Sequence, residues 1–352
     1  MGKSLFQLFN RRPMDSKPHI EQVSPRAAIV GGELQIRGSS FCSDGHQRPQ
    51  VKFGGIDASL LVSSDRYVVA RVPEGAVSCE LVVGNGKDSS NPCPIEIGVA
   101  IADNMHSVAN PAIDKAGNIF VTVSGPRGQK VPVCIYKIDA NYNVKPFLSD
   151  LMNPTGMAFD RNNFLYISSR HDGNIYRAAP NGTVTVYAES MGIATGIAFD
   201  GEEYLYVGDR SGTIFKISPD RQIFVFATLE PSISAYHLAF GTDGYLYVTG
   251  PTTSSHDCIY RISKAGDVEK FYRGLGRPQG MAFDIHGNMY VAASQAGRKG
   301  IFRIAPQGQT ELVVSGAGLV GLAITNGPAA ILATNQTVYH LNWDVRGKPL
   351  IA

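Results

Sequence analysis

Eleven polar side chains are candidates for a binding site, because they occupy equivalent places in a segment that repeats about every 40 residues. Six of them lie just before or at the start of a recurring apolar stretch, and five lie in turns further along the repeats. Their amides, hydroxyls and cations are suited to hydrogen-bonding a small polar, anionic or sugar-like ligand. The candidate ligand-binding residues are Asn153, Thr155, Arg170, His171, Thr195, Asp209, Arg210, Tyr236, His237, Gln279 and Arg298.

These side chains also have a purely structural interpretation, which is favoured for any one of them taken alone. Arg170 can pair with Asp209 or Asp172, because ion pairs also arise for structural reasons. His237 stands where neighbouring repeats have glycine. It can simply replace that glycine and hydrogen-bond a neighbouring loop.

Two His–Asp pairs suggest catalysis, with the imidazole as a base and the carboxylate as its orienting group. The pairs are His171–Asp172 and His256–Asp257. Residues adjacent on a chain rarely orient each other in this way, and no nucleophile-elbow motif accompanies either pair. Turn chemistry explains both aspartates more simply.

The elements that carry these residues are short strands that recur along most of the chain. Residues 153–189 contain four such strands, separated by the turn-forming segments DRNN, RHDG and PNG. The pattern returns at intervals of 40, 41, 43 and 41 residues, counted between Gly156, Gly196, His237, Gly280 and Gly321. A period of about 40 with four strands per unit is the signature of a β-propeller blade.

Weaker copies extend the repeat to six blades, beginning at about residue 99. The last copy contains sequence for four strands of its own, so we expect closure by blade packing or, alternatively, by an outer strand from residues 97–102. The Asp-x-x-Gly turns predict aspartates that hydrogen-bond the main chain two residues on, rather than calcium loops. Tyrosines recur at the blade period, which predicts packing between blades: Tyr166, Tyr176, Tyr206, Tyr247, Tyr260 and Tyr290.

The composition of the 352-residue chain is that of an ordinary globular protein, with 43% hydrophobic residues and a net charge of +2. Its basic residues are scattered, so they form no footprint for nucleic acid or an anionic membrane. No apolar run reaches membrane-spanning length and no secretory signal is recognised, so we expect a cytoplasmic protein with a flexible N-terminus at residues 1–16. The five cysteines form no CxxC pair, which favours buried, inert thiols.

A β pattern without the 40-residue period precedes the repeats. The opening PHIEQVSP, the Gly31-Gly32 turn before an alternating strand, and the later VKFGG, CELVVGNG and SNPCPIEIG resemble an immunoglobulin-like IPT/TIG domain. The resemblance covers residues 17–98 and implies a β-sandwich that serves as a spacer or interaction module. We therefore expect an all-β chain, with an immunoglobulin-like β-sandwich followed by a six-bladed β-propeller at residues 99–352.

The repeats resemble the NHL-repeat and senescence-marker/gluconolactonase superfamily of six-bladed propellers, through Gly-Met-Ala-Phe-Asp, then Gly-Asn-hydrophobic-Tyr-Val, then Ile-Tyr-Arg-Ile. The resemblance to metal-dependent lactonases implies a calcium or other divalent ion in the channel, held by Glu, Asn and Asp side chains. Asn110 lies one place from such a position. The positions themselves hold no carboxylate: they are Ala109, Thr155, Thr195, Tyr236, Gln279 and Val320.

Two main hypotheses follow. The first is a non-catalytic propeller that binds a protein partner or a small polar or anionic ligand on its loop-rich channel face, without a cofactor, nucleic acid or membrane. The alternative is a diverged lactonase-like hydrolase that acts through residues such as His237, Arg170 and Asp209, with a divalent ion as cofactor. A third, weaker hypothesis is a purely architectural protein. The sequence leaves open whether the chain is an enzyme.

Overall fold

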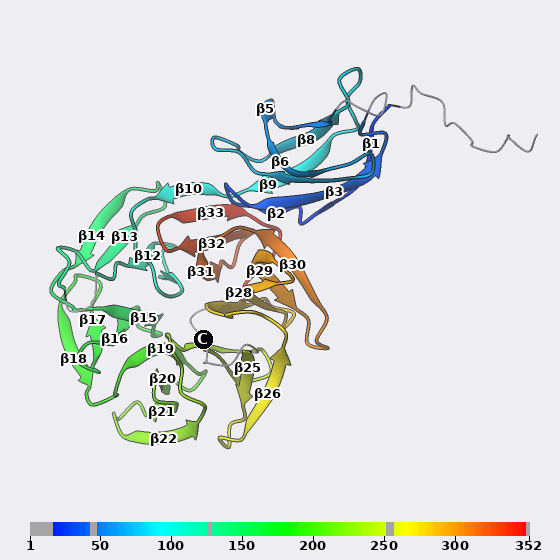
Figure 1. The fold of residues 1–352 in the computed structure, drawn as a ribbon. Helices are drawn as coiled ribbons and strands as arrows, with labels where there is room; N and C mark the ends of the chain where they lie inside the picture. Colours follow the sequence, from blue (N-terminus) through cyan, green and yellow to red (C-terminus); the bar gives the residue numbers. More distant parts are fainter. Residues whose placement is uncertain (1–16, 43–47, 126–128, 251–256, 350–352) are drawn as a thin grey trace, which may run out of the picture.

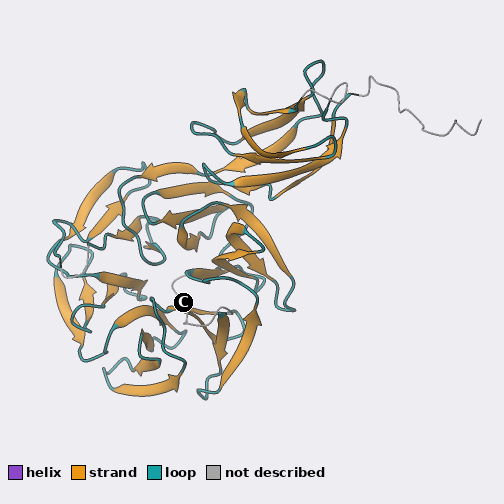
Figure 2. Ribbon diagram, viewed as in Figure 1, coloured by secondary structure: helices purple, strands orange, loops and turns teal. Residues whose placement is uncertain are grey.

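The computed structural model describes residues 17–42, 48–125, 129–250 and 257–349, which form strands and loops without a helix (Figure 2). The expected all-β architecture is confirmed, with a sandwich that precedes a propeller (Figure 1). The flexible start expected at residues 1–16 lies outside the described residues. Within the described ranges there is no helix long and apolar enough to span a membrane.

The N-terminal domain is a sandwich of two sheets, and its strands alternate because one face of each sheet is buried. In β3, for example, Leu34 and Ile36 are fully buried in the shared core while their neighbours are partly exposed. One sheet has the order β1 (His19–Ser24), β3 (Glu33–Ser39), β7 (Tyr67–Arg71), β6 (Ser59–Ser63). The other has the order β2 (Ala27–Ala28), β9 (Cys93–Ile97), β8 (Cys79–Gly84), β4 (Gln50–Phe53), β5 (Ile56–Asp57).

Six four-stranded antiparallel units, here called blades 1 to 6, form the ring seen in Figure 1. Blade 1 comprises β11 (Ala112–Ile113), β12 (Ile119–Thr122), β13 (Ile135–Ile138) and β14 (Val144–Leu148). Blade 2 comprises β15 (Pro154–Phe159), β16 (Leu165–Ser169), β17 (Ile175–Ala178) and β18 (Val184–Ala188). Blade 3 comprises β19 (Ala194–Phe199), β20 (Leu205–Asp209), β21 (Thr213–Ile217) and β22 (Ile223–Thr228).

Blades 4 and 5 follow the same plan, with the first strand innermost. Blade 4 comprises β23 (His237–Phe240), β24 (Leu246–Thr249), β25 (Cys258–Ile262) and β26 (Val268–Arg273). Blade 5 comprises β27 (Met281–Phe283), β28 (Met289–Gln295), β29 (Arg298–Ile304) and β30 (Thr310–Ser315). Apolar clusters between neighbouring blades form the core of the ring.

Blade 6 closes the ring with a strand taken from the start of the propeller. Its own strands are β31 (Leu319–Ile324), β32 (Ala329–Thr334) and β33 (Val338–Asn342), and its outer strand is β10 (Val99–Ala102). The alternative of a borrowed outer strand is therefore confirmed, and the expectation of four strands from the last repeat is wrong. The chain after β33 instead crosses to blade 5, where Lys348 N donates to Phe283 O at 2.8 Å.

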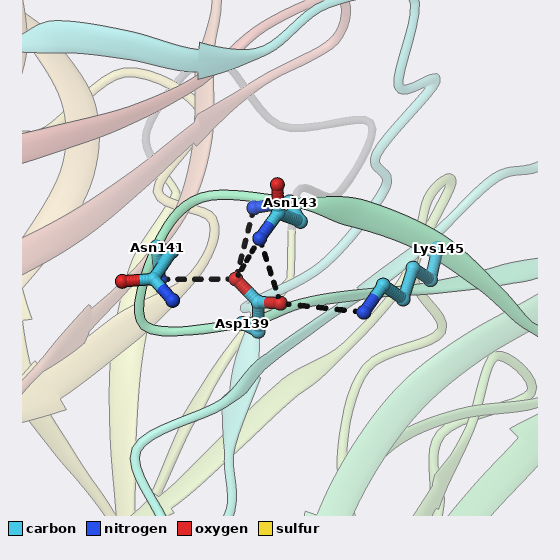
Figure 3. Close-up of polar contacts among 4 residues, drawn as sticks. All are labelled: Asp139, Asn141, Asn143 and Lys145. Carbon is cyan, nitrogen blue, oxygen red and sulfur yellow. Dashed lines mark hydrogen bonds and ion pairs between the residues drawn. The ribbon is translucent and has the colours of Figure 1, made fainter.

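The turns between the first two strands of blades 1 to 5 confirm the aspartate prediction, whereas blade 6 has Thr325 at this place. Asp200 Oδ1 accepts hydrogen bonds from Glu202 N and Tyr204 N, both at 2.9 Å, and Asp284 does the same for His286 N and Asn288 N. The same chemistry closes the turn between β13 and β14. There Asp139 accepts from Asn141 and Asn143 and pairs with Lys145 (Figure 3), and these hydrogen bonds lower the pKa of its carboxyl.

The recurring tyrosines pack between blades, as the sequence predicts. Tyr166 of blade 2 makes an edge-to-face contact with Phe199 of blade 3, and Tyr206 of blade 3 makes one with Phe240 of blade 4. The series continues to Trp343, whose ring lies 5.0 Å from that of Tyr290. Each of blades 1 to 5 is therefore joined to the next part of the ring by an aromatic pair.

The N-terminal domain is joined to the propeller by a continuous sheet. Strand β2 runs parallel to both β30 of blade 5 and β9 of its own domain, which makes one nine-stranded sheet (Figure 1). Ser315 anchors the junction, because its carbonyl accepts from Ile29 N and its hydroxyl from Glu33 N. Arg298 donates to Ser24 O at 3.0 Å. The domain is thus fixed to the ring rather than tethered to it.

The five cysteines are free thiols. Cys93, Cys134 and Cys258 are buried, whereas Cys42 and Cys79 are half-buried. Burial raises the pKa of the Cys134 thiol, which makes the reactive thiolate less populated. The buried, inert thiols expected from the sequence are therefore found at three of the five positions.

Candidate ligand cavity in the central channel

A cavity of about 320 Å³ lies in the central channel of the propeller. It begins among residues at the start of the inner strands, such as Asn110 and His237, and extends to the turns that follow those strands, at Asp160 and Asp200. Lys348 of the C-terminal segment borders it as well. Small-molecule sites in proteins begin at roughly 300 Å³, so the cavity matches a compact ligand.

One residue per blade controls how closely neighbouring inner strands approach. A Cβ atom on Gly196 would lie 2.5 Å from Tyr236 O, and one on Gly321 would lie 2.5 Å from Ala109 O. Only glycine fits at such separations. The equivalent residues of blades 1 to 6 are Asn110, Gly156, Gly196, His237, Gly280 and Gly321. The ring therefore has two similar halves, Gly-Gly-Asn in blades 5, 6 and 1 and Gly-Gly-His in blades 2, 3 and 4.

In the first half, the side chain of Asn110 joins two inner strands. Its Nδ2 donates to Met281 O of blade 5 at 2.8 Å, and its Oδ1 accepts from Leu322 N of blade 6 at 3.1 Å. These main-chain groups are available because the edge of an innermost strand has no partner strand. The carboxamide satisfies one acceptor and one donor at once.

In the second half, the register gives the same exposed edges. Asp160 N donates to Phe164 O, and Asp200 N donates to Tyr204 O. In an antiparallel pair every second residue of a strand bonds to the partner strand, and the residues between them direct their main-chain groups to the other side. Met157 and Ile197 lie between such residues, and their N–H and C=O groups point toward the channel, as those of Met281 and Leu322 do. No side chain in the described ranges hydrogen-bonds to the main chain of either residue. Both border the cavity.

His237 takes the place of Asn110 in this second half. Its side chain borders the cavity and the residue is 5% exposed. The sequence-based expectation of a hydrogen bond to a neighbouring loop is wrong, because the imidazole of His237 makes no hydrogen bond to a described residue. Burial lowers the pKa of the imidazole from 6.5 to about 4, so the ring is neutral at pH 7.

The buried imidazole predicts a stability loss in mild acid. The folded-state pKa lies below the unfolded one, so the contribution is fully present above pH 6.5 and is lost as the pH falls toward 4. We expect a loss of about 3 kcal/mol from this group. Urea unfolding of wild type and His237→Asn at several pH values would measure it. His171→Asn, on an exposed loop residue, serves as the control and keeps the wild-type profile. An unchanged profile for His237→Asn would contradict the prediction.

Lys348 lies at the end of the cavity opposite His237. Its ammonium donates to Phe240 O at 3.0 Å and to Gly241 O at 3.1 Å, which ties the C-terminal segment to blade 4. Burial lowers the pKa of this amine. The sequence analysis did not identify Lys348, because nothing in a lone lysine near the end of the chain indicates where the segment folds back.

The aspartates at this end are engaged by their own turns. Asp160 accepts from Asn162 N and Phe164 N and lies 4.0 Å from Arg177. Asp200 is bonded to its turn amides and to the hydroxyl of Tyr206 at 3.2 Å. Their oxygens therefore stabilise hairpins. Besides the main-chain edges, the polar residues that border the cavity include His237, Arg161 and Glu203.

Several of the other sequence-predicted residues hydrogen-bond to main-chain groups of the loop-rich face. Thr195 is fully buried, donates to Gly208 O and accepts from Tyr236 N. Thr155 donates to Asn153 O, which also accepts from Arg170 N. The Oδ1 of Asn153 is buried without a hydrogen-bond partner in the described part of the chain. The structure thus brings these residues together on one face.

The remaining candidates are more dispersed. Asp209 accepts from Ile193 N at 2.7 Å and braces the loop before blade 3, whereas Arg210 donates to Ile233 O at 2.8 Å and braces the loop before blade 4. Gln279 is half-buried, and its carbonyl accepts from Thr249 at 2.6 Å. His171 is exposed, whereas Arg298 faces the N-terminal domain. Among the eleven candidates, His237 borders the cavity. His256 lies outside the described residues.

The residues at the lactonase metal positions do not fit a divalent ion. Ala109 offers no side-chain oxygen, the Thr155 hydroxyl is engaged with Asn153 O, and the carboxamide of Asn110 is committed to two strands. Hard cations require several converging oxygen donors, usually with a carboxylate among them. In the described ranges no group of three or more His, Cys, Asp or Glu side chains is arranged to hold a metal.

Comparison with known proteins identifies the N-terminal domain and supports the propeller. The IPT/TIG domain family model matches residues 18–97. No curated protein matches the chain. An auxiliary nutrient binding protein from Bacteroides thetaiotaomicron is similar in structure, with a TM-score of 0.54 and 13% identity over 94% of this chain and 99% of that one.

Two enzymes have related structures. A gluconolactonase from Xanthomonas campestris gives a TM-score of 0.59 and 15% identity, over 70% of this chain and 89% of that one. A catalytically inactive virginiamycin B lyase from Staphylococcus aureus, studied with quinupristin, gives 0.52 and 14%, over 88% and 98%. At such identities the likeness concerns the fold alone. Propellers of this shape therefore include both binding proteins and enzymes.

Proposed function

We propose that the protein is a non-catalytic binding propeller, which holds a small polar ligand in its central channel while the N-terminal domain acts as a fixed support. The observation that carries the proposal is the cavity of about 320 Å³, bordered by the exposed edges of inner strands and by the neutral imidazole of His237. Such a site offers hydrogen-bond donors and acceptors to a polar ligand.

Three further features support binding over hydrolysis. An imidazole with a pKa of about 4 is a weak general base at pH 7. Of the three acidic residues that border the cavity, Asp160 and Asp200 have their carboxylates occupied by their own turns, and the third is Glu203. The nutrient binding protein from Bacteroides thetaiotaomicron combines this overall fold with a binding role, and it matches nearly the whole of this chain.

The proposal is tested with a library of small polar molecules and thermal-shift detection. We expect ligands that stabilise the wild type and lose their effect in His237→Trp, because the indole fills the cavity. His171→Trp is the matched control on the loop-rich face, where the sequence analysis placed the site, and it retains the effect. Ligands lost in His171→Trp but kept in His237→Trp would place binding on the loops and overturn the cavity assignment.

The metal-dependent alternative predicts that a divalent ion raises the melting temperature, and the binding proposal predicts that it does not. We expect calcium, magnesium, manganese and zinc at micromolar concentrations to leave the melting temperature unchanged, because the six positions that correspond to the lactonase metal ligands hold no carboxylate. A metal ion that binds only the folded protein would add about 2.7 kcal/mol to the free energy of unfolding when its concentration is a hundred times the dissociation constant. A chelator-reversible shift with calcium or manganese would contradict this prediction, and lactone substrates would then be assayed.

A further inference from the structure

The two halves of the ring suggest what kind of ligand the channel recognises. In one half, Asn110 reaches past the glycines of blades 5 and 6 to Met281 O and Leu322 N. A Cβ added to Gly280 would collide with Oδ1 of Asn110, and one added to Gly321 would contact its Cα. The carboxamide of Asn110 therefore lies over Gly280 and its main chain lies over Gly321, where neighbouring strand edges come close together.

The second half has the same two glycines and differs at the third position, where His237 replaces Asn110. A Cβ on Gly196 would lie 2.9 Å from the Cα of His237, just as one on Gly321 would lie 2.7 Å from the Cα of Asn110. A Cβ on Gly156 would lie 2.9 Å from Ile197 N. The groups that correspond to Met281 O and Leu322 N are therefore Met157 O and Ile197 N.

The difference between the halves is the side chain at the third position. The amide of Asn110 bonds to both of its strands, whereas the imidazole of His237 bonds to no described residue. An acceptor on β15 and a donor on β19 thus face the cavity beside a neutral imidazole. A buried main-chain group without a partner is costly, so such a pair favours a ligand that satisfies both groups.

We infer that the channel binds a ligand with a cis-amide edge, such as a primary carboxamide, a lactam or a ureide. In these groups the N–H and the C=O point to the same side, as in the side chain of Asn110. The ligand N–H donates to Met157 O, its C=O accepts from Ile197 N, and His237 closes the site. A carboxylate or a lactone lacks the donor, and a trans peptide presents its two groups on opposite sides. The inference rests on the proposed binding function and names its ligand class.

The probes are three seven-membered rings of nearly equal size: ε-caprolactam, its N-methyl derivative and ε-caprolactone. Each is titrated into the full-length ¹⁵N-labelled protein, and the main-chain amide signals of Ile197 and Leu322 are followed. We expect a saturable shift at Ile197 with caprolactam, with at least tenfold weaker binding of the other two rings. Leu322, whose amide is bonded to Asn110, serves as the internal control and shifts little.

His237→Asn provides the decisive variant, because it turns the second half into a copy of the first. Its carboxamide is expected to occupy Met157 O and Ile197 N and to abolish lactam binding. His171→Asn is the matched control, because it makes the same substitution on an exposed residue outside the cavity, and it retains binding within a few-fold. The melting temperatures of both variants show that each is folded, and the probe series on the wild type is informative without them.

Each outcome bears on the inference separately from the proposed function. Suppose that all three rings bind equally well and that all lose binding in His237→Trp. The cavity would then remain a ligand site, but the preference for an amide would be overturned. Lactam binding that survives in His237→Asn would also overturn it. Library ligands that bind in the cavity without a cis-amide edge, with no response to caprolactam, would do the same. If neither the library nor the rings bind in the cavity, the proposed function fails and the inference fails with it.

Discussion

Tyr206→Ala is expected to lower the free energy of unfolding by about 3–5 kcal/mol, the usual cost of deleting a buried aromatic ring. Tyr206 is 3% exposed, and its ring lies 4.9 Å from that of Phe226 and 5.0 Å from that of Phe240. The substitution therefore opens a cavity between blades 3 and 4 and removes two edge-to-face contacts. Urea or thermal unfolding of the purified variant measures the loss.

Tyr206→Phe separates the ring from its hydroxyl. The hydroxyl donates to Asp200 at 3.2 Å, and we expect its removal to cost about 1 kcal/mol, since the carboxylate stays bonded to its own turn. The Ala and Phe variants should thus differ by severalfold. A similar small cost for both would mean that the neighbouring blades repack around the gap, and the aromatic series would not be what holds the blades together.

Much of the fold could be predicted because its signals are local and repeated. Alternating apolar residues, turn-forming aspartates and a 40-residue period specify strands, hairpins and blades independently of one another. The sequence left two ways of closing the ring open. The closing strand, Val99–Ala102, follows the N-terminal domain in sequence but pairs with β33 about 240 residues away. Pairing over such a separation leaves no local pattern to decide between them. The same holds for β2, a two-residue strand that joins the domains.

The candidate site was only partly predictable. His237 was recognisable because it interrupts a series of glycines, and that interruption places it in the channel wall. The other important groups, Met157 O and Ile197 N, belong to the main chain and have the same chemistry whatever the residue. Asn110 interrupts the same series, but nothing local in the sequence indicates that its carboxamide bonds to two other strands. Comparing the two halves of the ring required the structure.

Gly196→Ala is expected to destabilise the ring, because the added methyl group meets main chain of the next blade. The new Cβ would lie 2.5 Å from Tyr236 O and 2.9 Å from the Cα of His237, and both neighbours are main chain. The inner strands of blades 3 and 4 must then move apart, and overpacking of this kind costs about 1–3 kcal/mol, occasionally more. Because Ile197 N moves with its strand, ligand binding in the channel should weaken as well. Unfolding experiments and the same ligand titration measure both effects.

Gly201→Ala is the matched control, because a Cβ at that position has no neighbour within 4 Å. A surface change of this kind is expected to alter the free energy of unfolding by at most about 0.5 kcal/mol. If both alanine variants were equally stable, the inner strands would be able to separate without cost. The close approach over the glycines, and with it the correspondence between Asn110 and His237, would then not be fixed by packing. A large difference confined to Gly196 instead means that rigid strand edges line the channel, which is the property a preorganised binding site requires.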